Sequence, residues 1–128
     1  MTPQDVLANM DAVVACIEPA VKRSNGRYQT GDVIALVLQN TMRCWASVGE
    51  NIEAVAITQF LNFPRVRVLS MPFVGGRNMD QWFGFMDEVI IWAKDQGCTQ
   101  IETYDARGGA WQRKLGWDTH YLAIGKDI

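Results

Sequence analysis

The sequence predicts an α/β protein in which helices flank a mixed, mainly antiparallel sheet. Hydrophobic residues recur every three or four positions in some segments and every second position in others, which are the periods of amphipathic helices and of strands. Turn residues such as Gly49-Glu50-Asn51 separate the segments. The resulting order is helix, helix, three strands, helix, strand, short helix, strand. This order is typical of a layered α/β domain.

Two predicted helices open the chain. Apolar residues at helical spacing predict the first over Thr2–Lys22, and we expect Pro19 to end or bend it. After a turn at Ser24–Arg27, Thr30 is the predicted cap of a second helix. Asp32 lies in its first turn, where a carboxylate favours the helix dipole. The buried stripe of this helix consists of Val33, Ile34, Val37 and Leu38.

Three predicted strands follow, joined by short turns. They span Met42–Val48, Ile52–Phe60 and Val66–Met71. Short connections join antiparallel neighbours, so these strands predict an antiparallel meander. Pro72 lacks the N–H group that a central strand uses, and we expect it to end the third strand. Gly75-Gly76 is then predicted to be a flexible loop.

The last part of the chain alternates helix and strand. The predicted elements are a long helix over Met79–Gln96 that stops at Gly97, a strand over Thr99–Tyr104, a short helix over Gly109–Leu115 and a last strand over Trp117–Ile124. No repeat, linker or low-complexity segment divides the sequence. We therefore expect residues 1–128 to form a single domain.

Composition and charge argue against several function classes. Twelve lysine and arginine residues against fourteen acidic residues give a net charge of −2, so a broad nucleic-acid-binding face is not expected. Cys16, Cys44 and Cys98 are widely spaced and His120 is the one histidine, so neither a disulfide framework nor a metal site is predicted. No apolar run reaches the roughly 18 residues that span a bilayer, and we expect no membrane partner and a cytoplasmic location.

The junction between the third strand and the long helix is the candidate anion site. Unpaired N–H groups at a helix N-terminus bind anions. Gly75 and Gly76 would let a phosphate group approach the backbone, and Arg77 would add positive charge. In the purely structural interpretation of the same residues, the glycines make a turn and Asn78 caps the helix.

The order of elements and the end of the chain resemble the GNAT N-acetyltransferase superfamily. The segment from Ala110 to Trp117 is similar to the family's short helix with its lysine–leucine–glycine–aromatic ending. Residues Trp92–Thr99 and Arg107–Trp111 are similar to short GNAT-like proteins of tailed phages and prophages. The resemblance implies that acetyl-CoA is the cofactor, that the third strand pairs with its pantetheine arm and that a glycine-rich loop holds its pyrophosphate. The implied cofactor-binding residues are Met71, Phe73, Val74, Gly75, Gly76, Arg77 and Asn78.

Three features depart from the family's pattern. The two glycines are adjacent and Arg77 follows them, whereas the family's loop usually reads Gln/Arg-x-x-Gly-x-Gly/Ala. Gln112 stands where the family often has a tyrosine that protonates the departing CoA thiolate, and an amide does not serve as that acid. The family's first strand is missing before the opening helix.

Other residues are candidates for proton transfer. Tyr104 and Asp105 are the predicted catalytic residues, because they lie where the fourth strand ends beside the implied cofactor cleft. Glu53 and Glu102 lie on predicted strands and are further candidates for the base. In the structural interpretation, Asp105 caps the short helix and Tyr104 is a core residue with its hydroxyl at the rim.

A basic and aromatic cluster near the end of the chain is a candidate protein interface. Its members are Arg107, Trp111, Arg113 and Trp117. Tryptophan and arginine are enriched among the residues that anchor interfaces. The alternative is that the short helix packs on the sheet and its charges are solvated.

The departures favour a phage-type GNAT-like protein with a degraded acetyl-CoA site, working as a non-catalytic binding or structural module. Its partner would be a protein, such as another virion protein, in a bacterial host cell or in the virion. The alternative is an active acetyl-CoA-dependent N-acetyltransferase that acts on an amine of a protein or small molecule. A nucleic-acid-binding protein would instead need a basic groove. If CoA binds, we expect Gly76→Val to abolish binding and to leave the fold near wild type.

Overall fold

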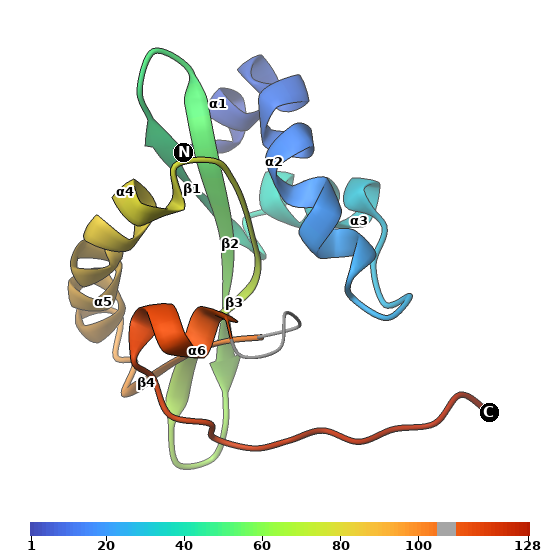
Figure 1. Ribbon diagram of the computed structural model, residues 1–128, viewed down its shortest axis with the longest axis vertical. Coiled ribbons are helices and arrows are strands. Elements are labelled where there is room, and N and C mark those ends of the chain that lie inside the picture. Colours follow the sequence, from blue (N-terminus) through green and yellow to red (C-terminus); the bar gives the residue numbers. More distant parts are fainter. Residues whose placement is uncertain (105–109) are drawn as a thin grey trace.

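A four-stranded sheet lies between two layers of helices in the computed structural model, which describes residues 1–104 and 110–128 without the side chains of Ala110 and Trp111 (Figure 1). The helices are α1 (Pro3–Ala8), α2 (Met10–Lys22), α3 (Thr30–Leu38), α4 (Met79–Gly84), α5 (Met86–Asp95) and α6 (Ala110–Leu115), and the strands are β1 (Arg43–Val48), β2 (Ile52–Asn62), β3 (Arg67–Gly76) and β4 (Gln100–Thr103). The strand order is β1-β2-β3-β4. The first three strands are antiparallel and β4 is parallel to β3, which confirms the predicted fold class.

The opening helix is divided into α1 and α2, where one helix over Thr2–Lys22 was predicted. Thr2 and Asp5 form a capping box at the start of α1, and the side chain of Asn9 donates to the Asp5 carbonyl where the helix breaks. Pro19 does not end α2, which continues to Lys22. Because Pro19 is exposed, the carbonyl that loses its helical partner can be hydrated by water.

The cap of α3 is one residue earlier than predicted. Gln29 is the N-cap, and its backbone N–H donates to the carboxylate of Asp32 at 2.9 Å. Thr30 is therefore the first residue of the helix instead of its cap. The side chain of Asp32 lies in the first turn, as expected, where it satisfies a backbone donor and complements the helix dipole.

The third strand continues through Pro72, contrary to the prediction. The register between β2 and β3 shifts, because Ile57 pairs with Phe73 whereas Gln59 pairs with Ser70. The extra residue on β3 makes this a bulge, and Pro72 lies within it, so its missing N–H breaks no regular ladder bond. Beyond the bulge the predicted glycine loop is strand: Gly75 and Gly76 pair with Val55 and Ala54.

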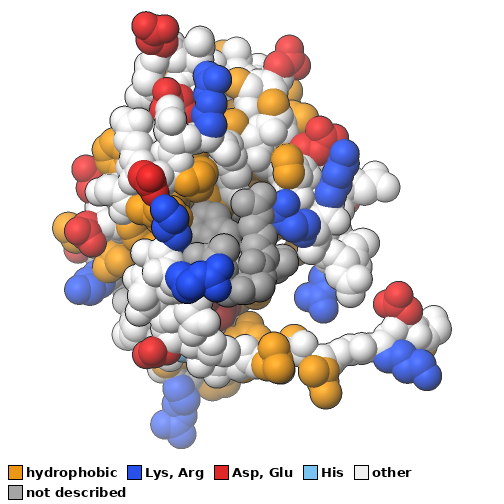
Figure 2. Space-filling view, in the orientation of Figure 1, with side chains coloured by type: hydrophobic (Ala, Val, Ile, Leu, Met, Phe, Trp, Pro, Cys, Tyr) orange, Lys and Arg blue, Asp and Glu red, His pale blue; other side chains and the backbone are white. Residues whose placement is uncertain are grey.

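The second half of the chain also differs from the predicted elements. The long helix is divided at Phe85 into α4 and α5, and β4 spans Gln100–Thr103 only. The predicted last strand over Trp117–Ile124 is wrong, since this segment pairs with no described strand. Residues 117–128 instead form an extended tail (Figure 1), and Figure 2 shows hydrophobic side chains along it. Leu122 and Ile124 are almost fully exposed.

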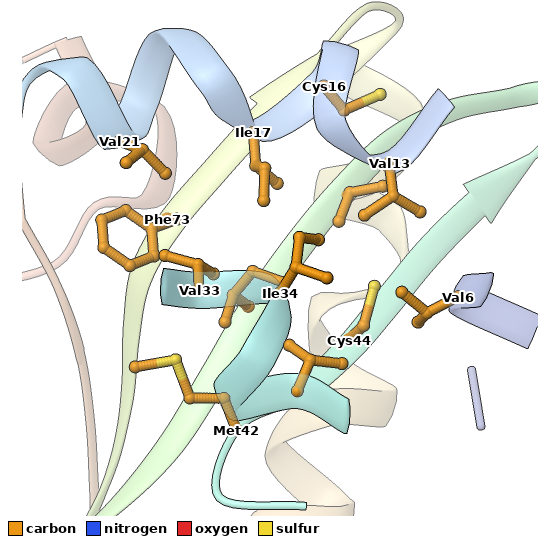
Figure 3. Close-up of a cluster of buried hydrophobic side chains, with 13 residues drawn as sticks. Val6, Val13, Cys16, Ile17, Val21, Val33, Ile34, Met42, Cys44 and Phe73 are labelled. Carbon is orange, nitrogen blue, oxygen red and sulfur yellow. The ribbon is translucent and has the colours of Figure 1, made fainter. Parts of the chain in front are cut away.

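Each face of the sheet has its own hydrophobic core. The first lies under α1–α3 and joins Val13 and Ile17 to Cys44, Ile57 and Phe73 (Figure 3). The ring of Phe73 also meets that of Tyr28 edge to face, with 5.3 Å between centroids. The second core lies under α4 and α5. It consists of Ala54, Ala56, Leu69, Met71, Val74, Trp82, Met86, Val89, Ala93 and Cys98. No described helix is long and apolar enough to cross a membrane.

The three cysteines are buried as free thiols. Burial raises the pKa of Cys44 to about 11, against a smaller opposing effect of the N-terminal ammonium group. Burial also raises the pKa values of Cys16 and Cys98. A raised pKa keeps each thiol protonated, and the thiolate is the reactive form.

We expect the native protein to react only slowly with an aromatic disulfide reagent at about pH 8, where these thiols are protonated and shielded. Unfolding in guanidinium should release all three thiols at once. The measurement is absorbance of the released thiolate over time, with Asn51→Cys in the exposed β1–β2 turn as a reactive control. Fast reaction of the native wild type would contradict the packing described around Cys44.

Candidate functional site

The candidate anion site lies where β3 passes into α4. Gly76 has a positive φ of 126°, and Asn78 adopts the left-handed conformation with φ 54° and ψ 45° before α4 begins at Met79. Asn78 is the N-cap of α4, as the structural interpretation expects, although its side chain makes no capping hydrogen bond. Arg77 is exposed next to it, and its backbone N–H donates to the Glu53 carbonyl at 2.8 Å.

Packing within the fold accounts for both glycines. A Cβ atom on Gly75 would overlap the backbone carbonyl oxygen of Cys16 in α2. A Cβ atom on Gly76 would overlap the Glu53 carbonyl oxygen and the Ala54 backbone in β2, at a φ that favours glycine. The structure therefore contradicts the expectation that Gly76→Val leaves the fold near wild type. The sequence predicted that a phosphate group would lie close to these glycines, but α2 and β2 of the chain itself occupy that space.

An open hollow of about 560 Å³ lies at the start of α4. Asn78, Met79, Asp80, Gln81 and Lys114 line it. The backbone N–H groups of Gln81 and Trp82 donate to the Asn78 carbonyl. Those of Asn78, Met79 and Asp80 have no hydrogen-bond acceptor among the described residues. The hollow thus offers backbone donors of the kind that bind anions.

A salt bridge between α4 and α6 occupies the side of this hollow. Lys114 Nζ lies 2.7 Å from Asp80 Oδ1, with both side chains more than half exposed. Lys114 also lies over the ring of Phe83, 5.9 Å from its centroid. Because residues 80 and 114 are far apart in sequence, motif spacing did not reveal this pair. Asp80 places a negative charge at the edge of the predicted anion site.

The remaining predicted cofactor-binding residues are buried. Met71, Phe73 and Val74 are at most 6% exposed, and their side chains lie in the two cores. Only their backbone groups can face a ligand. β4 pairs with β3 only as far as Met71, opposite Thr103, so residues 72–76 have no strand partner on that side among the described residues. Thr103 Oγ1 donates to the Met71 carbonyl at 2.8 Å at the point where the two strands separate.

A tyrosine pair lies beyond the end of β4. Tyr104 is half exposed, so it is not the core residue of the structural interpretation. Asp105 lies outside the described residues. Tyr121, which the sequence analysis did not single out, is hydrogen-bonded to Glu102: partial burial, the charges of Glu102 and Tyr104 and this hydrogen bond raise the pKa of Tyr121. The wrongly predicted last strand hid this contact, since it placed Tyr121 in a regular pleat.

The other proton-transfer candidates are apart from this pair. The carboxylate of Glu53 lies against Gly49 in the β1–β2 turn. The amide of Gln112, in the position of the family's acid, donates to Thr119 Oγ1 at 3.0 Å. The structure thus brings Glu102, Tyr104 and Tyr121 together without Glu53 or Gln112.

The candidate protein interface is only partly visible. Arg107 and the side chain of Trp111 lie outside the described residues. Arg113 is exposed on α6, whereas Trp117 is half-buried and packs against the core under α4 and α5. Trp117 therefore has a packing role. No described residues form a cluster of three metal-ligating side chains, and acidic and basic side chains are interspersed on the face in Figure 2.

Comparison with known structures identifies the architecture. A probable acetyltransferase superposes with a TM-score of 0.72 at 7% identity, covering 100% of this chain and 95% of that one. A ribosomal-protein-alanine N-acetyltransferase from Brucella melitensis biovar Abortus 2308 gives a TM-score of 0.70 at 11% identity, covering 100% and 96%. The chain has a GNAT-like fold. No model of a protein family and no curated protein sequence matches it.

A third neighbour has the same fold. An aminoglycoside acetyltransferase from an uncultured soil metagenomic sample, solved in complex with sisomicin, has a TM-score of 0.70 at 8% identity and covers 100% of this chain and 93% of that one. Identities this low show the fold alone. The hollow at the start of α4 lies at the strand–helix junction where the sequence resemblance led us to expect the pyrophosphate.

We expect Gly75→Ala to lower the free energy of unfolding by about 2–3 kcal/mol, because α2 or β3 must move to admit the methyl group. Urea denaturation followed by circular dichroism measures this loss. The matched control is Gly84→Ala in α4, where a Cβ atom meets nothing within 4 Å and where we expect a gain of up to about 1 kcal/mol. Equal stability of Gly75→Ala and wild type would refute the packing role of Gly75.

Proposed function

We propose that this protein is a non-catalytic binding module, built on a GNAT-like fold, whose acetyl-CoA site is degraded. The observation that carries the proposal is the carboxylate of Asp80 at the edge of the hollow where a pyrophosphate would lie. A carboxylate repels phosphate oxygens, and it also neutralises Lys114, the lysine that lines the same hollow. The site therefore offers a bound anion little net positive charge.

The residues around the hollow do not fit a pyrophosphate well. Gly75 and Gly76 are required by the packing of α2 and β2, and the N–H group of Arg77 is already bonded to Glu53. Three backbone donors at the start of α4 remain, but α4 is a short helix of six residues. The dipole of so short a helix would stabilise a doubly charged group only slightly.

The acid position supports the same proposal. Gln112 takes the place of a tyrosine and its amide is engaged with Thr119. An amide does not release a proton near neutral pH, so it cannot protonate a leaving thiolate. Loss of this group together with the altered anion site favours a scaffold that has been kept for binding.

The partner in this proposal is a protein, such as another virion protein if the chain is of phage origin. Arg113 is exposed on α6 and belongs to the proposed surface. Arg107 and Trp111 belong to the same proposed surface, and Trp117 would stabilise it from below through its packing on the core. Release of the partner by the double variant Trp111→Ala and Arg113→Ala would support this assignment.

We expect isothermal titration of the wild type with acetyl-CoA, and with CoA, to give no saturable heat up to about 1 mM, a dissociation constant that corresponds to only about −4 kcal/mol. A known GNAT enzyme serves as the positive control. Binding near 1 µM, about −8 kcal/mol, would contradict the proposal and restore the cofactor site.

We expect Asp80→Asn to bind CoA more tightly than wild type, because the change removes the repulsive charge and frees Lys114. The matched control is Asp87→Asn, which removes the same charge in the first turn of α5, outside the hollow. Titration of both variants under the same conditions separates a local effect from the change in net charge. Equal behaviour of the two variants would show that Asp80 does not block the site.

A second candidate function is an active acetyl-CoA-dependent N-acetyltransferase, and the contact between Tyr121 and Glu102 favours it. A tyrosine hydroxyl is protonated at neutral pH, and the hydrogen bond to Glu102 holds that of Tyr121 at the end of β4, where it could donate a proton; its raised pKa makes it a weaker acid than a free tyrosine. If an acceptor screen finds turnover, Tyr121→Phe should lower kcat by a factor of about 100. Unchanged kcat in that variant would remove Tyr121 from this candidate mechanism.

A further inference from the structure

A notch interrupts the sheet beside β2, on the side of the first strand. β1 begins at Arg43, opposite Thr58, whereas β2 continues to Asn62. Residues 59–62 of β2 therefore pair with β3 on one side only and have no strand partner on the other among the described residues. Unpaired N–H and C=O groups on a strand edge are a template for another extended chain.

A cavity of about 430 Å³ lies at this notch. Its floor includes Thr58, Gln59 and Phe60 of β2, and Trp92 of α5 lines it as well. Residues near the start of the chain and in the α3–β1 connection form its remaining walls. The volume lies within the range of ligand-binding clefts, and the lining combines aromatic with polar groups, as such clefts usually do.

Arg43 gives the notch its charge and its geometry. Its guanidinium group lies 5.1 Å from the centroid of the Trp45 ring and 4.9 Å from that of Trp92. The Trp45 ring is itself fixed, because its Nε1 donates to Thr58 Oγ1 at 2.9 Å. These cation–π contacts hold the positive charge of Arg43 against the aromatic wall of the notch.

The guanidinium of Arg43 has no carboxylate partner among the described residues, where the ion pairs are Lys22–Glu18 and Lys114–Asp80. Asp5 lines the same cavity, but its carboxylate accepts from the Thr2 backbone N–H at 2.9 Å as part of the α1 cap. An arginine without an ion-pair partner matches a carboxylate, which a guanidinium group can bind through two parallel hydrogen bonds.

The aromatic wall continues beyond Arg43. Phe60 stacks on Trp92 with 5.4 Å between centroids, and Arg67 lies 3.9 Å from the centre of the Phe60 ring. The side chain of Arg67 also donates to the Gln96 carbonyl. These contacts join Arg43, Trp92, Phe60 and Arg67 in one wall, and side chains that are already packed lose less entropy when a ligand binds.

We propose that the notch binds an extended acidic peptide segment, whose backbone pairs with the free edge of β2 at residues 59–62 and whose carboxylate binds Arg43. Strand addition supplies affinity through main-chain hydrogen bonds, while the arginine supplies selectivity for an acidic side chain. This site is separate from the hollow at the start of α4 and does not depend on whether CoA binds.

The probe is a short capped peptide of alternating valine and glutamate, compared with its glutamine analogue by isothermal titration. We expect the acidic peptide to bind at least about tenfold more tightly, with shifts of the Trp45 and Trp92 indole signals in nuclear magnetic resonance spectra. Free glutamate should bind much more weakly, because it cannot pair with β2. Equal affinity of acidic and neutral peptides, equal affinity of free glutamate, or no binding at about 1 mM would overturn the proposal.

Variants locate the site. Arg43→Gln should weaken binding of the acidic peptide about tenfold and leave the glutamine analogue unchanged. Asp5→Asn should strengthen binding of the acidic peptide, since it removes a negative charge from the cavity wall. Arg65→Gln, in the exposed β2–β3 turn, is the matched control and should change nothing. If Arg43→Gln fails to fold, Arg43→Lys tests the same point, because lysine keeps the charge but loses the planar fork; unchanged affinity in the folded variant would overturn the proposal.

Discussion

Antiparallel hydrogen bonds between β2 and β3 hold the two longest strands together, and the other elements pack on this pair or extend it. β1 and β4 add to its two sides, and α2 lies across both strands. Alternation along β2 sends Val55 and Ile57 into one core and Ala54 and Ala56 into the other. A shift of one residue in this register would exchange the two faces, so the pairing specifies both cores at once.

The bulge near Pro72 determines what the residues at the end of β3 contact. It lets the strand continue past a proline and carries Gly75 and Gly76 against α2 and β2. Glycines that bring a helix so close to a strand are no longer available to bring a cofactor close. The hollow at α4 therefore results from the packing of β3 against α2 and β2, and Asp80 and Lys114 line its side. Packing and ligand approach compete for the same small residues.

Local signals in the sequence predicted much of this fold. Periodicity located the described helical segments and the first four predicted strands, although it merged α1 with α2 and α4 with α5, because side-chain burial repeats with the geometry of each element. Errors arose where tertiary contacts override local preference. Pro72 is tolerated because a bulge receives it, and the tail at residues 117–124 is rich in the aromatic and hydrophobic residues typical of strands but finds no described partner. Neither outcome follows from propensity alone.

The candidate sites were predictable only in part. The position of the anion hollow follows from a strand–glycine–helix junction, which is a local pattern. Its chemistry does not, since Lys114 reaches Asp80 from a distant helix. The contact of Tyr121 with Glu102 and the stack on Arg43 likewise join residues from separate elements. Such contacts depend on the relative placement of elements, which spacing within one segment does not encode.

The tail beyond α6 is held to the rest of the described structure at only a few residues. Trp117 packs against the core and Tyr121 contacts Glu102, but Leu122, Ile124 and Ile128 project into solvent. Extended, exposed backbone is what proteases cleave most readily. Limited digestion would thus cut the chain after Tyr121 and leave both cores intact, and a fluorophore attached to these exposed residues would not disturb the sheet.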